Sequence, residues 1–162
     1  IPEYNIGDLD FANELVLALD TIQDPGNLGT IVRLADWFGI NSIICSHDTV
    51  DIFSPKVVQS TMGAITRVKV VYCDLKEELL KIKSKVSIYG TFMEGNNIYE
   101  TELKPQGILV MGNEGNGISP EIEKLVSHKI HIPSFAKDRT NVESLNVAMA
   151  TAIVCSEFQR RN

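Results

Sequence analysis

Long apolar runs are missing from this sequence of 162 residues. A membrane-spanning helix needs roughly 20 consecutive, mostly apolar residues, and no stretch approaches that length, so helical insertion into a membrane is excluded. With 44% hydrophobic and 22% charged residues, the chain suits one well-packed domain and is too short for two of ordinary size. The opening segment IPEYNIGDLD also lacks the apolar core of a signal peptide.

Cysteine is scarce, with only Cys45, Cys73 and Cys155 in the chain. Their number is odd and no two are spaced as CxxC, which argues against both a disulfide framework and a zinc site. We interpret each as a small buried hydrophobic residue in a protein of the reducing cytoplasm. The histidines form no convincing metal set either, because His128 and His131 stand three apart on an expected strand and therefore on opposite faces.

An excess of positive charge is missing as well. Lys and Arg number 15 against 21 Asp and Glu, which gives a formal net charge of -6. Such a chain is not expected to bind nucleic acid through its overall field. A role with RNA would require a local basic patch or another domain.

Apolar strands alternate with amphipathic helices along the chain. Residues 15–19 form a near-continuous apolar run, which is typical of a strand covered on both faces in a parallel sheet. The turn DPG follows, Asn27 stands where a helix N-cap belongs, and apolar residues recur at helical spacing until Gly39. This alternation predicts an α/β domain with a mostly parallel sheet. Further strands are expected at 41–45, 67–73, 85–93, 107–112 and 128–133, further helices at 54–65, 74–84, 119–127 and 144–161, and a loop or short hairpin at 94–107.

A glycine-rich loop, VMGNEGNGISPE (110–121), connects an expected strand to an expected helix. The spacing of Gly112, Gly115 and Gly117 matches neither nucleotide template, and Glu114 stands where a phosphate-binding loop would need a lysine. One interpretation is a pocket rich in backbone groups at the carboxyl end of a strand, where open α/β sheets hold ligands. The other is a tight strand-to-helix connection, with Ser119 as N-cap and a proline in the first helical position.

Three segments together resemble the SpoU-like (TrmH-type) RNA 2'-O-ribose methyltransferases of the SPOUT superfamily. They are DTIQDPGNLGTIVRLADWFGI (20–40), LVMGNEGNGIS (109–119) and IHIPSFAKDRTNVESLNVAMATAIVCSE (130–157). The resemblance implies a parallel-sheet α/β/α domain with a C-terminal trefoil knot, an exception to the rule that chains do not knot. It also implies S-adenosylmethionine as the methyl donor. That cofactor has no phosphate and carries a sulfonium cation, so a loop with a glutamate and no lysine is electrostatically sensible.

The resemblance implies catalytic roles for five residues. Arg33 matches an arginine placed at the reacting ribose, either as general base or as an anchor for phosphate or ribose, and we favour the anchor because a guanidinium is a poor base. Asn27 organises the active-site loop or only caps a helix, and Glu114 orients Arg33 or the loop. Ser144 and Asn146 belong to the SLN signature and contact the substrate ribose and adjoining loops, or only cap the last helix.

Cofactor-binding roles carry over to Gly112, Ile132 and Leu145, with Thr91 as a weaker candidate. The apolar side chains at 132 and 145 would cover the adenine. The intervening stretch PSFAKDRTNVES (133–144) is a few residues longer than the family's compact loop, which leaves its geometry open. Lys137 and Arg139 in this stretch either reach RNA phosphate or belong to an exposed charged loop.

The last helix, expected at 146–158, carries apolar or small residues nearly all round, which predicts burial on more than one side. It is either an interior helix of the monomer or, as the resemblance implies, a homodimer interface beside both active sites, and we expect a homodimer through this helix.

The expected function is methyl transfer from S-adenosylmethionine to a ribose 2'-hydroxyl of tRNA or rRNA. Residues 15–162 would form the catalytic domain and residues 1–14 the remnant of a linker from an N-terminal RNA-binding domain. The alternative is a catalytically idle RNA-binding module of the same fold. A generic nucleotide-binding domain fails on the glycine spacing and the missing lysine.

Overall fold

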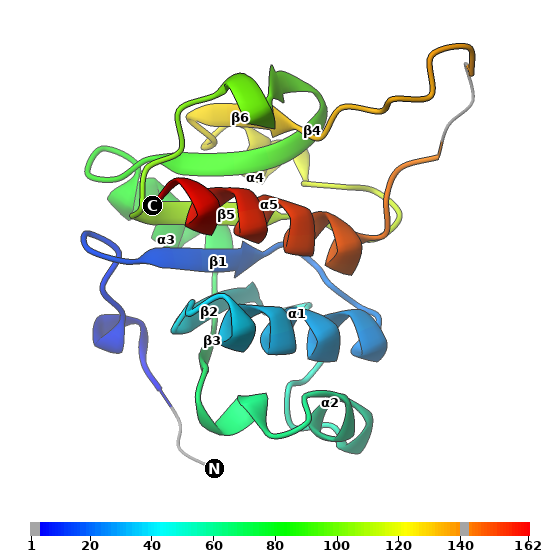
Figure 1. Ribbon diagram of the computed structural model, residues 1–162. Helices are drawn as coiled ribbons and strands as arrows, with labels where there is room; N and C mark the ends of the chain where they lie inside the picture. The colour runs from blue at the N-terminus through cyan, green and yellow to red at the C-terminus, as the bar shows by residue number, and fades with distance from the viewer. Residues whose placement is uncertain (1–3, 140–142) are drawn as a thin grey trace.

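A single six-stranded sheet organises the computed structural model, which describes residues 4–139 and 143–162. All its neighbouring strands are parallel, and the strand order is β3-β2-β1-β5-β4-β6 (Figure 1). The α/β class predicted from the sequence is confirmed. The strands are β1 (Leu15–Leu19), β2 (Ser42–Ser46), β3 (Lys69–Cys73), β4 (Ile88–Asn97), β5 (Gly107–Met111) and β6 (His128–His131).

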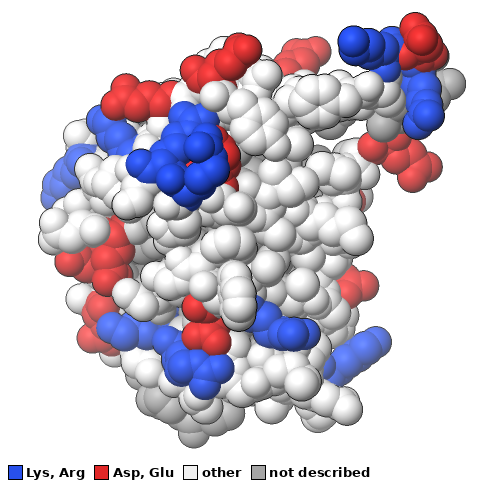
Figure 2. All heavy atoms as spheres, viewed as in Figure 1, with Lys and Arg blue, Asp and Glu red and all other residues white. Residues whose placement is uncertain are grey.

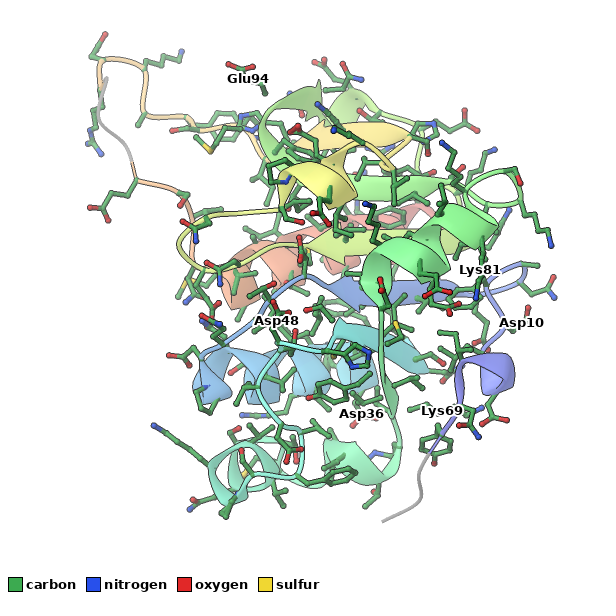
Figure 3. All side chains as sticks on the ribbon, turned by 180° about the vertical axis from the view of Figure 1, so that it is seen from behind. Asp10, Asp36, Asp48, Lys69, Lys81 and Glu94 are labelled. Carbon is green, nitrogen blue, oxygen red and sulfur yellow. The ribbon has the colours of Figure 1, made fainter. Side chains whose placement is uncertain are left out.

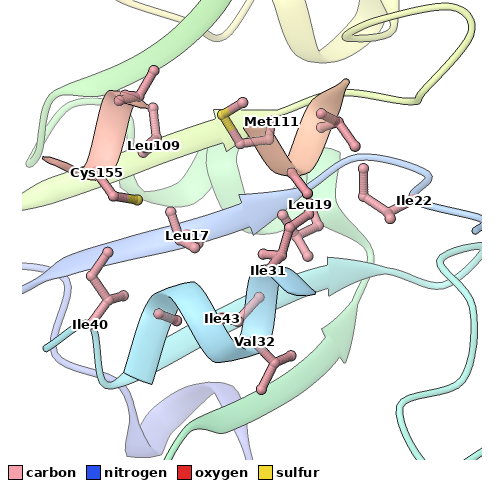
Figure 4. Close-up of a cluster of buried hydrophobic side chains, with 14 of the residues drawn as sticks. Leu17, Leu19, Ile22, Ile31, Val32, Ile40, Ile43, Leu109, Met111 and Cys155 are labelled. Atoms are coloured by element: carbon pink, nitrogen blue, oxygen red, sulfur yellow. The ribbon is translucent and has the colours of Figure 1, made fainter. Parts of the chain in front are cut away.

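Helices cover both faces of the sheet, because successive side chains of each central strand point to opposite faces. From β1, Leu17 and Leu19 join one buried cluster, whereas Val16 and Ala18 join the other. The first cluster lies under α1 (Pro25–Trp37) and α5 (Val147–Arg161), as Figure 4 shows for part of it. The second lies under α3 (Leu75–Ile82) and α4 (Pro120–Glu123), which are nearer the viewer in Figure 3. The remaining short elements are α2 (Pro55–Ser60), η1 (Ile6–Asp8), η2 (Ala64–Thr66) and η3 (Ile98–Glu100).

The start of α1 differs from the sequence prediction. Asp24, not Asn27, is the N-cap: its backbone is extended and its carboxylate accepts the Asn27 N–H at 3.0 Å. Pro25 then takes the first helical position, where its fixed φ suits the helix and its missing N–H costs nothing. Asn27 therefore lies inside the first turn, and its side chain is available for other contacts.

Other boundaries also move. The helix expected at 54–65 ends at Ser60, and Gly63, at φ +89°, separates it from the short turn η2. The helix expected at 119–127 is the single turn of α4. β4 continues into the stretch expected as a loop, and after a register shift between Thr91 and Asn96 it pairs with β6 again. A Cβ on Gly95 would lie 2.8 Å from the Ile130 carbonyl carbon, so glycine permits this close second pairing.

The three cysteines are all buried, as predicted, and carry free thiols. Burial raises the pKa of Cys73 to about 11 and that of Cys155 to about 12, so both stay protonated and unreactive near neutral pH. Among the residues that the structure describes, no helix is long and apolar enough to cross a membrane.

The chain before β1 packs on the domain where it is described. Tyr4, Ile6, Leu9 and Phe11 lie half-buried against the second cluster. The assignment of residues 1–14 as a linker remnant stays a prediction, and residues 1–3 lie outside the described chain. The trefoil knot also stays a prediction, because the connection from β6 to α5 passes through residues 140–142, which lie outside it too.

One side of α5 is buried within this chain and the other is not. Val154 and Phe158 are fully buried, whereas Met149 is 64% exposed. The helix is therefore not an interior helix of the monomer, and burial on a second side would require another chain. Its C-terminal turn is fixed by Glu157, whose carboxylate accepts from Arg160 and Arg161, and Arg161 donates in turn to the backbone carbonyls of Ile98 and Thr101.

Replacing Glu157 by glutamine should destabilise the fold in a pH-dependent way. The guanidinium of Arg160 and then that of Arg161 lower the pKa of Glu157 to about 2, against a usual 4.5. A depressed carboxylate pKa contributes stability above the unfolded-state pKa and loses it as pH falls toward the folded value. We expect Glu157→Gln to lower the free energy of unfolding by about 1–3 kcal/mol at pH 7, from lost bonds to a charged group. Thermal unfolding of both proteins should converge between about pH 4.5 and pH 2; parallel curves would contradict the assignment.

Candidate functional site

A pocket of about 360 Å³ opens at the carboxyl ends of β4, β5 and β6. The chain leaves β1 toward β2 on one side, while β5 and β4 lie on the other, so the order of the sheet reverses beside β1. Open parallel sheets hold ligands at such a reversal. The walls come from four parts of the chain: the middle of β4, the end of β5 with the loop after it, the last residue of α4, and the segments that flank the connection between β6 and α5.

The loop after β5 is closed on itself. Asn113 and Gly117 exchange both backbone hydrogen bonds, at 3.0 and 2.9 Å, and the Asn113 side chain accepts from the N–H groups of Gly115 and Asn116. Gly117 has φ +70°, which favours glycine. A Cβ on Gly112 would lie 2.2 Å from the Ile118 nitrogen. The loop therefore presents backbone to the pocket and leaves no room for a side chain at Gly112.

Glu114 fastens this loop to the loop after β1. Its carboxylate accepts from the N–H of Gln23 at 3.1 Å, from the N–H of Asp24 at 2.6 Å, and from the Asn27 amide at 3.4 Å. Burial acts to raise its pKa, but the backbone N–H donors and the Asn27 amide outweigh that, and the pKa lies below its usual value. In the described residues the Glu114 carboxylate thus contacts the loop after β1 and the side chain of Asn27, and it makes no ion pair with Arg33.

Asn146 joins the third segment to the other two. Its Nδ2 donates to Asn27 Oδ1 at 3.1 Å, while its Oδ1 accepts from the N–H groups of Ala148 and Met149 and caps α5. The Asn146 side chain therefore caps α5 and contacts Asn27 at the same time. Glu114, Asn27 and Asn146 form a continuous polar chain across three segments that lie far apart in the sequence. Ser144 lies close by in sequence, exposed and on the pocket wall.

Arg33 lies apart from this cluster. It is exposed on α1, six residues after Asn27, which places it about 9 Å further along the helix axis and about 120° around it. It does not line the pocket, and its side chain makes no hydrogen bond or ion pair with any residue in the described ranges 4–139 and 143–162. It lines a different groove instead.

The four candidate cofactor residues, by contrast, come together. Thr91, Gly112, Ile132 and Leu145 all line the pocket, although they come from four different segments. Leu145 is 50% exposed and stands at the rim. Lys137 and Arg139 are exposed on the chain after β6, which projects from the body of the domain in Figures 1 and 2.

Sequence reasoning missed several residues of the site. The Asn113 amide donates to the Thr21 carbonyl at 2.7 Å and holds this threonine at φ +61°, an unusual conformation for a β-branched residue. Asp20, buried just after β1, accepts the backbone N–H of Ser119 at 2.7 Å. Ser119 is the N-cap residue of α4, as the second interpretation of the loop expected, although its side chain makes no capping hydrogen bond. His131 lines the pocket, and its Nδ1 lies 3.0 Å from the Phe92 carbonyl. A local signal existed only for Asn113, which begins a glycine turn.

The pocket is acidic and partly apolar. Glu114 and Glu123 line it, and no lysine or arginine does so among the described residues. In the same part of the chain, no cluster of three His, Cys, Asp or Glu residues is placed to hold a metal ion. The arrangement suits an uncharged or cationic ligand held through backbone groups better than a phosphate.

Replacing Glu114 by glutamine should loosen the two loops. Glutamine keeps one acceptor oxygen and turns an NH₂ group toward backbone N–H donors, so at least one donor loses its partner. We expect a loss of about 1–3 kcal/mol in the free energy of unfolding, measured by chemical denaturation. Glu121→Gln, an exposed glutamate just beyond the loop, is the control and should change stability by less than about 0.5 kcal/mol. Equal stabilities for the two variants would contradict the role of Glu114.

Comparison with known proteins gives one consistent result. The model of the SpoU rRNA Methylase family matches residues 14–156. The chain is 33% identical to the Bacillus subtilis 23S rRNA (guanosine(2553)-2'-O)-methyltransferase RlmP over 86% of its own length and 55% of the relative. It is also 33% identical to the Neisseria meningitidis 23S rRNA (guanosine-2'-O-)-methyltransferase RlmB, over 91% and 58%. The chain thus spans little more than half the length of these curated relatives.

Solved structures agree with the sequence relatives. A Porphyromonas gingivalis protein assigned to the TrmH family of RNA methyltransferases is 44% identical, with a TM-score of 0.85 over 93% of this chain and 61% of that one. An AdoMet-bound rRNA methyltransferase from Sinorhizobium meliloti is 30% identical, with a TM-score of 0.88 over 99% and 61%.

Proposed function

The chain belongs to the SpoU rRNA methylase family, and from that premise we propose that it transfers a methyl group from S-adenosylmethionine to a ribose 2'-hydroxyl of rRNA or tRNA. The observation that carries the proposal is the pocket at the ends of β4, β5 and β6, where all four candidate cofactor residues meet. The polar chain of Glu114, Asn27 and Asn146 borders that pocket and supports the same activity.

The pocket suits S-adenosylmethionine on the chemistry of its walls. The space that a Cβ on Gly112 would need is already filled by loop backbone, so main-chain groups face the ligand directly. Ile132 and Leu145 offer apolar cover for an adenine, and Glu114 offers a negative charge to a cation. When bound, this cofactor supplies an electrophilic methyl group on a sulfonium. Thr91 lies where the register between β4 and β6 shifts, and it would close the pocket on the side of β6.

We assign the candidate catalytic residues different roles according to where they lie. Glu114 and Asn27 act as positioning residues, since their contacts are with loops and with each other. Ser144 is exposed on the pocket wall, whereas Asn146 does not line the pocket and is joined to Asn27; we assign both of them contacts with the substrate ribose. Arg33 would anchor the phosphate or ribose of the RNA, because a guanidinium is a poor base but offers a fork of N–H donors that suits phosphate.

A homodimer through α5 would complete the site. Arg33 lies outside the pocket of its own chain, and we propose that it serves the pocket of a second copy. The exposed side of α5, with Met149, is available for that contact, and Figure 2 shows few charged side chains over the middle of the face that α5 and α1 form. Sedimentation should therefore find a dimer at micromolar concentration; a strict monomer would count against this assembly.

Recognition of the particular RNA would lie largely outside this domain. Its net charge is -6, and the curated relatives are longer than the chain. We propose residues 1–14 as a linker from an RNA-binding domain, and tRNA or rRNA as the target of a cytoplasmic enzyme. The exposed Lys137 and Arg139 could add phosphate contacts.

Calorimetric titration with S-adenosylmethionine and S-adenosylhomocysteine tests the proposal. We expect binding near one site per chain. A catalytically idle RNA-binding module is the second candidate, favoured only by the separation of Arg33 from the pocket. A folded, dimeric chain that binds neither compound would replace the enzyme by that module.

A further inference from the structure

A second groove lies on the outer side of α1, away from the cofactor pocket. Arg33, Trp37 and Phe38 form one wall, and Met62 and Arg67, from the segment that follows α2, form the other. Its volume is about 640 Å³. Within the described chain it shares no lining residue with the cofactor pocket, so it is a separate site.

The walls expose two large apolar side chains. Trp37 is 83% exposed and Met62 is 74% exposed. Met62 also has φ +53°, an uncommon conformation for any residue except glycine, and strain of this kind gathers at functional sites. The turn formed with Gly63 thus holds the Met62 side chain at the groove, where it gains no burial within the chain.

The charges of the groove favour an anion. Arg67 forms a two-pronged ion pair with Asp36, with Nη2 to Oδ2 at 2.8 Å and Nε to Oδ1 at 3.0 Å (Asp36 is labelled in Figure 3). That pair neutralises both charges and ties the two walls together. Arg33 contacts no carboxylate in the described ranges, and it stands four residues before Trp37, on the same face of α1.

An aromatic ring beside a guanidinium is the combination that holds single-stranded RNA. Bases stack on the ring, whatever their sequence, and the guanidinium holds the adjoining phosphate. A volume of about 640 Å³ lies in the range that accommodates small ligands, and so suits one nucleotide. Arg33 also lines this groove. In the proposed function, Arg33 binds the ribose or phosphate of the substrate.

We propose that this groove binds one nucleotide of the substrate RNA, with its base against Trp37 and Met62 and its phosphate at Arg33. The inference rests on the proposed function, because it takes RNA to be the substrate and extends the role of Arg33. It names Trp37 as a residue that binds substrate and has no contact with the cofactor.

Tryptophan fluorescence tests the groove directly, because Trp37 is the single tryptophan of the chain. The full chain is titrated with a short single-stranded oligoribonucleotide of mixed sequence at low salt. We expect saturable quenching of the emission, protection from iodide, and reversal by salt, since the phosphate contact is electrostatic. Emission that is unchanged by an RNA which binds would overturn the proposal.

Variants separate the groove from the pocket. Trp37→Ala should weaken RNA binding roughly 5- to 150-fold, the usual effect of removing one stacking residue, while Trp37→Phe keeps most of the affinity. Both should bind S-adenosylmethionine as the wild type does. Leu80→Ala, at an exposed leucine of α3, is the matched control and should change neither affinity. RNA affinity that is equal in Trp37→Ala and wild type would overturn the inference.

A second copy of the chain is the competing occupant. If Trp37 is already shielded from iodide without RNA, and Trp37→Ala weakens the dimer, the groove is an interface and the proposal fails. The proposed function fails separately: a chain whose emission is quenched by RNA but which binds no S-adenosylmethionine keeps the groove and loses the methyltransferase.

Discussion

Alanine in place of Gly112 is expected to weaken S-adenosylmethionine binding strongly. The added Cβ would lie 2.2 Å from the Ile118 nitrogen and 2.3 Å from the Gly117 carbonyl carbon. Both atoms are backbone, so no side-chain rotation relieves the overlap and the loop itself must move. Since the loop presents its backbone to the pocket, that movement removes the groups proposed to hold the cofactor. We expect the affinity for S-adenosylmethionine to fall by about 100-fold or more, which is the order of effect expected when binding groups are displaced by about 1 Å.

Calorimetry measures this, with Gly115→Ala as the control from the same loop. A Cβ at Gly115 meets only the Asn113 side-chain oxygen, at 3.5 Å, which is an ordinary contact. The control should bind within a few-fold of wild type. Wild-type affinity in Gly112→Ala would mean that the loop does not form the cofactor site.

Arg33→Ala, unlike Gly112→Ala, should lower the rate of methyl transfer without changing the affinity for the cofactor. Because Arg33 lies outside the pocket, cofactor affinity should stay at the wild-type value. Methyl transfer to RNA should fall by about 100-fold or more, the usual loss when a charge that positions the reacting group is removed. Arg33→Lys should recover part of the rate, since an ammonium keeps the charge but not the fork of a guanidinium. Equal losses in cofactor affinity and rate would place Arg33 at the cofactor instead.

Mixed dimers test whether Arg33 serves the other chain. Neither Arg33→Ala nor Gly112→Ala should be active alone. If Arg33 acts across the dimer, a mixed dimer has one complete site, formed by the intact pocket of the first variant and the arginine of the second. Random mixing should restore about a quarter of the wild-type rate. If Arg33 acts within its own chain, mixing restores nothing.

Local sequence signals predicted the elements of the fold because the spacing of apolar residues within each strand or helix can be recognised without knowing its neighbours. The buried strand at 15–19 and the glycine end of α1 needed no tertiary information. β4 could not be predicted in full, because its second half pairs with β6 only through a close approach at Gly95. That approach involves residues more than 30 positions apart.

Contacts between distant parts of the chain also limited what could be predicted of the site. Gly112 and Glu114 stand out in the sequence as a glycine loop of the wrong charge for phosphate. What Glu114 binds was not predictable, since its partners are backbone groups about 90 positions away. The cap at Asp24 left Asn27 available to bond Asn146, and that contact exists only once α1 and α5 are packed together. The catalytic role of Arg33 is implied by the family resemblance and stays a prediction, and only the fold places this residue outside the pocket.

The most direct measurement follows a radiolabelled methyl group from S-adenosylmethionine into RNA and then hydrolyses that RNA in alkali. Alkaline cleavage needs a free 2'-hydroxyl to attack the neighbouring phosphate, so a 2'-O-methylated nucleotide resists cleavage on its 3' side. We predict that the label appears in alkali-resistant dinucleotides and disappears when Arg33 is replaced by alanine. Label released in mononucleotides would mean methylation of a base, and a chain that binds the cofactor but transfers no label to RNA would contradict the proposed activity.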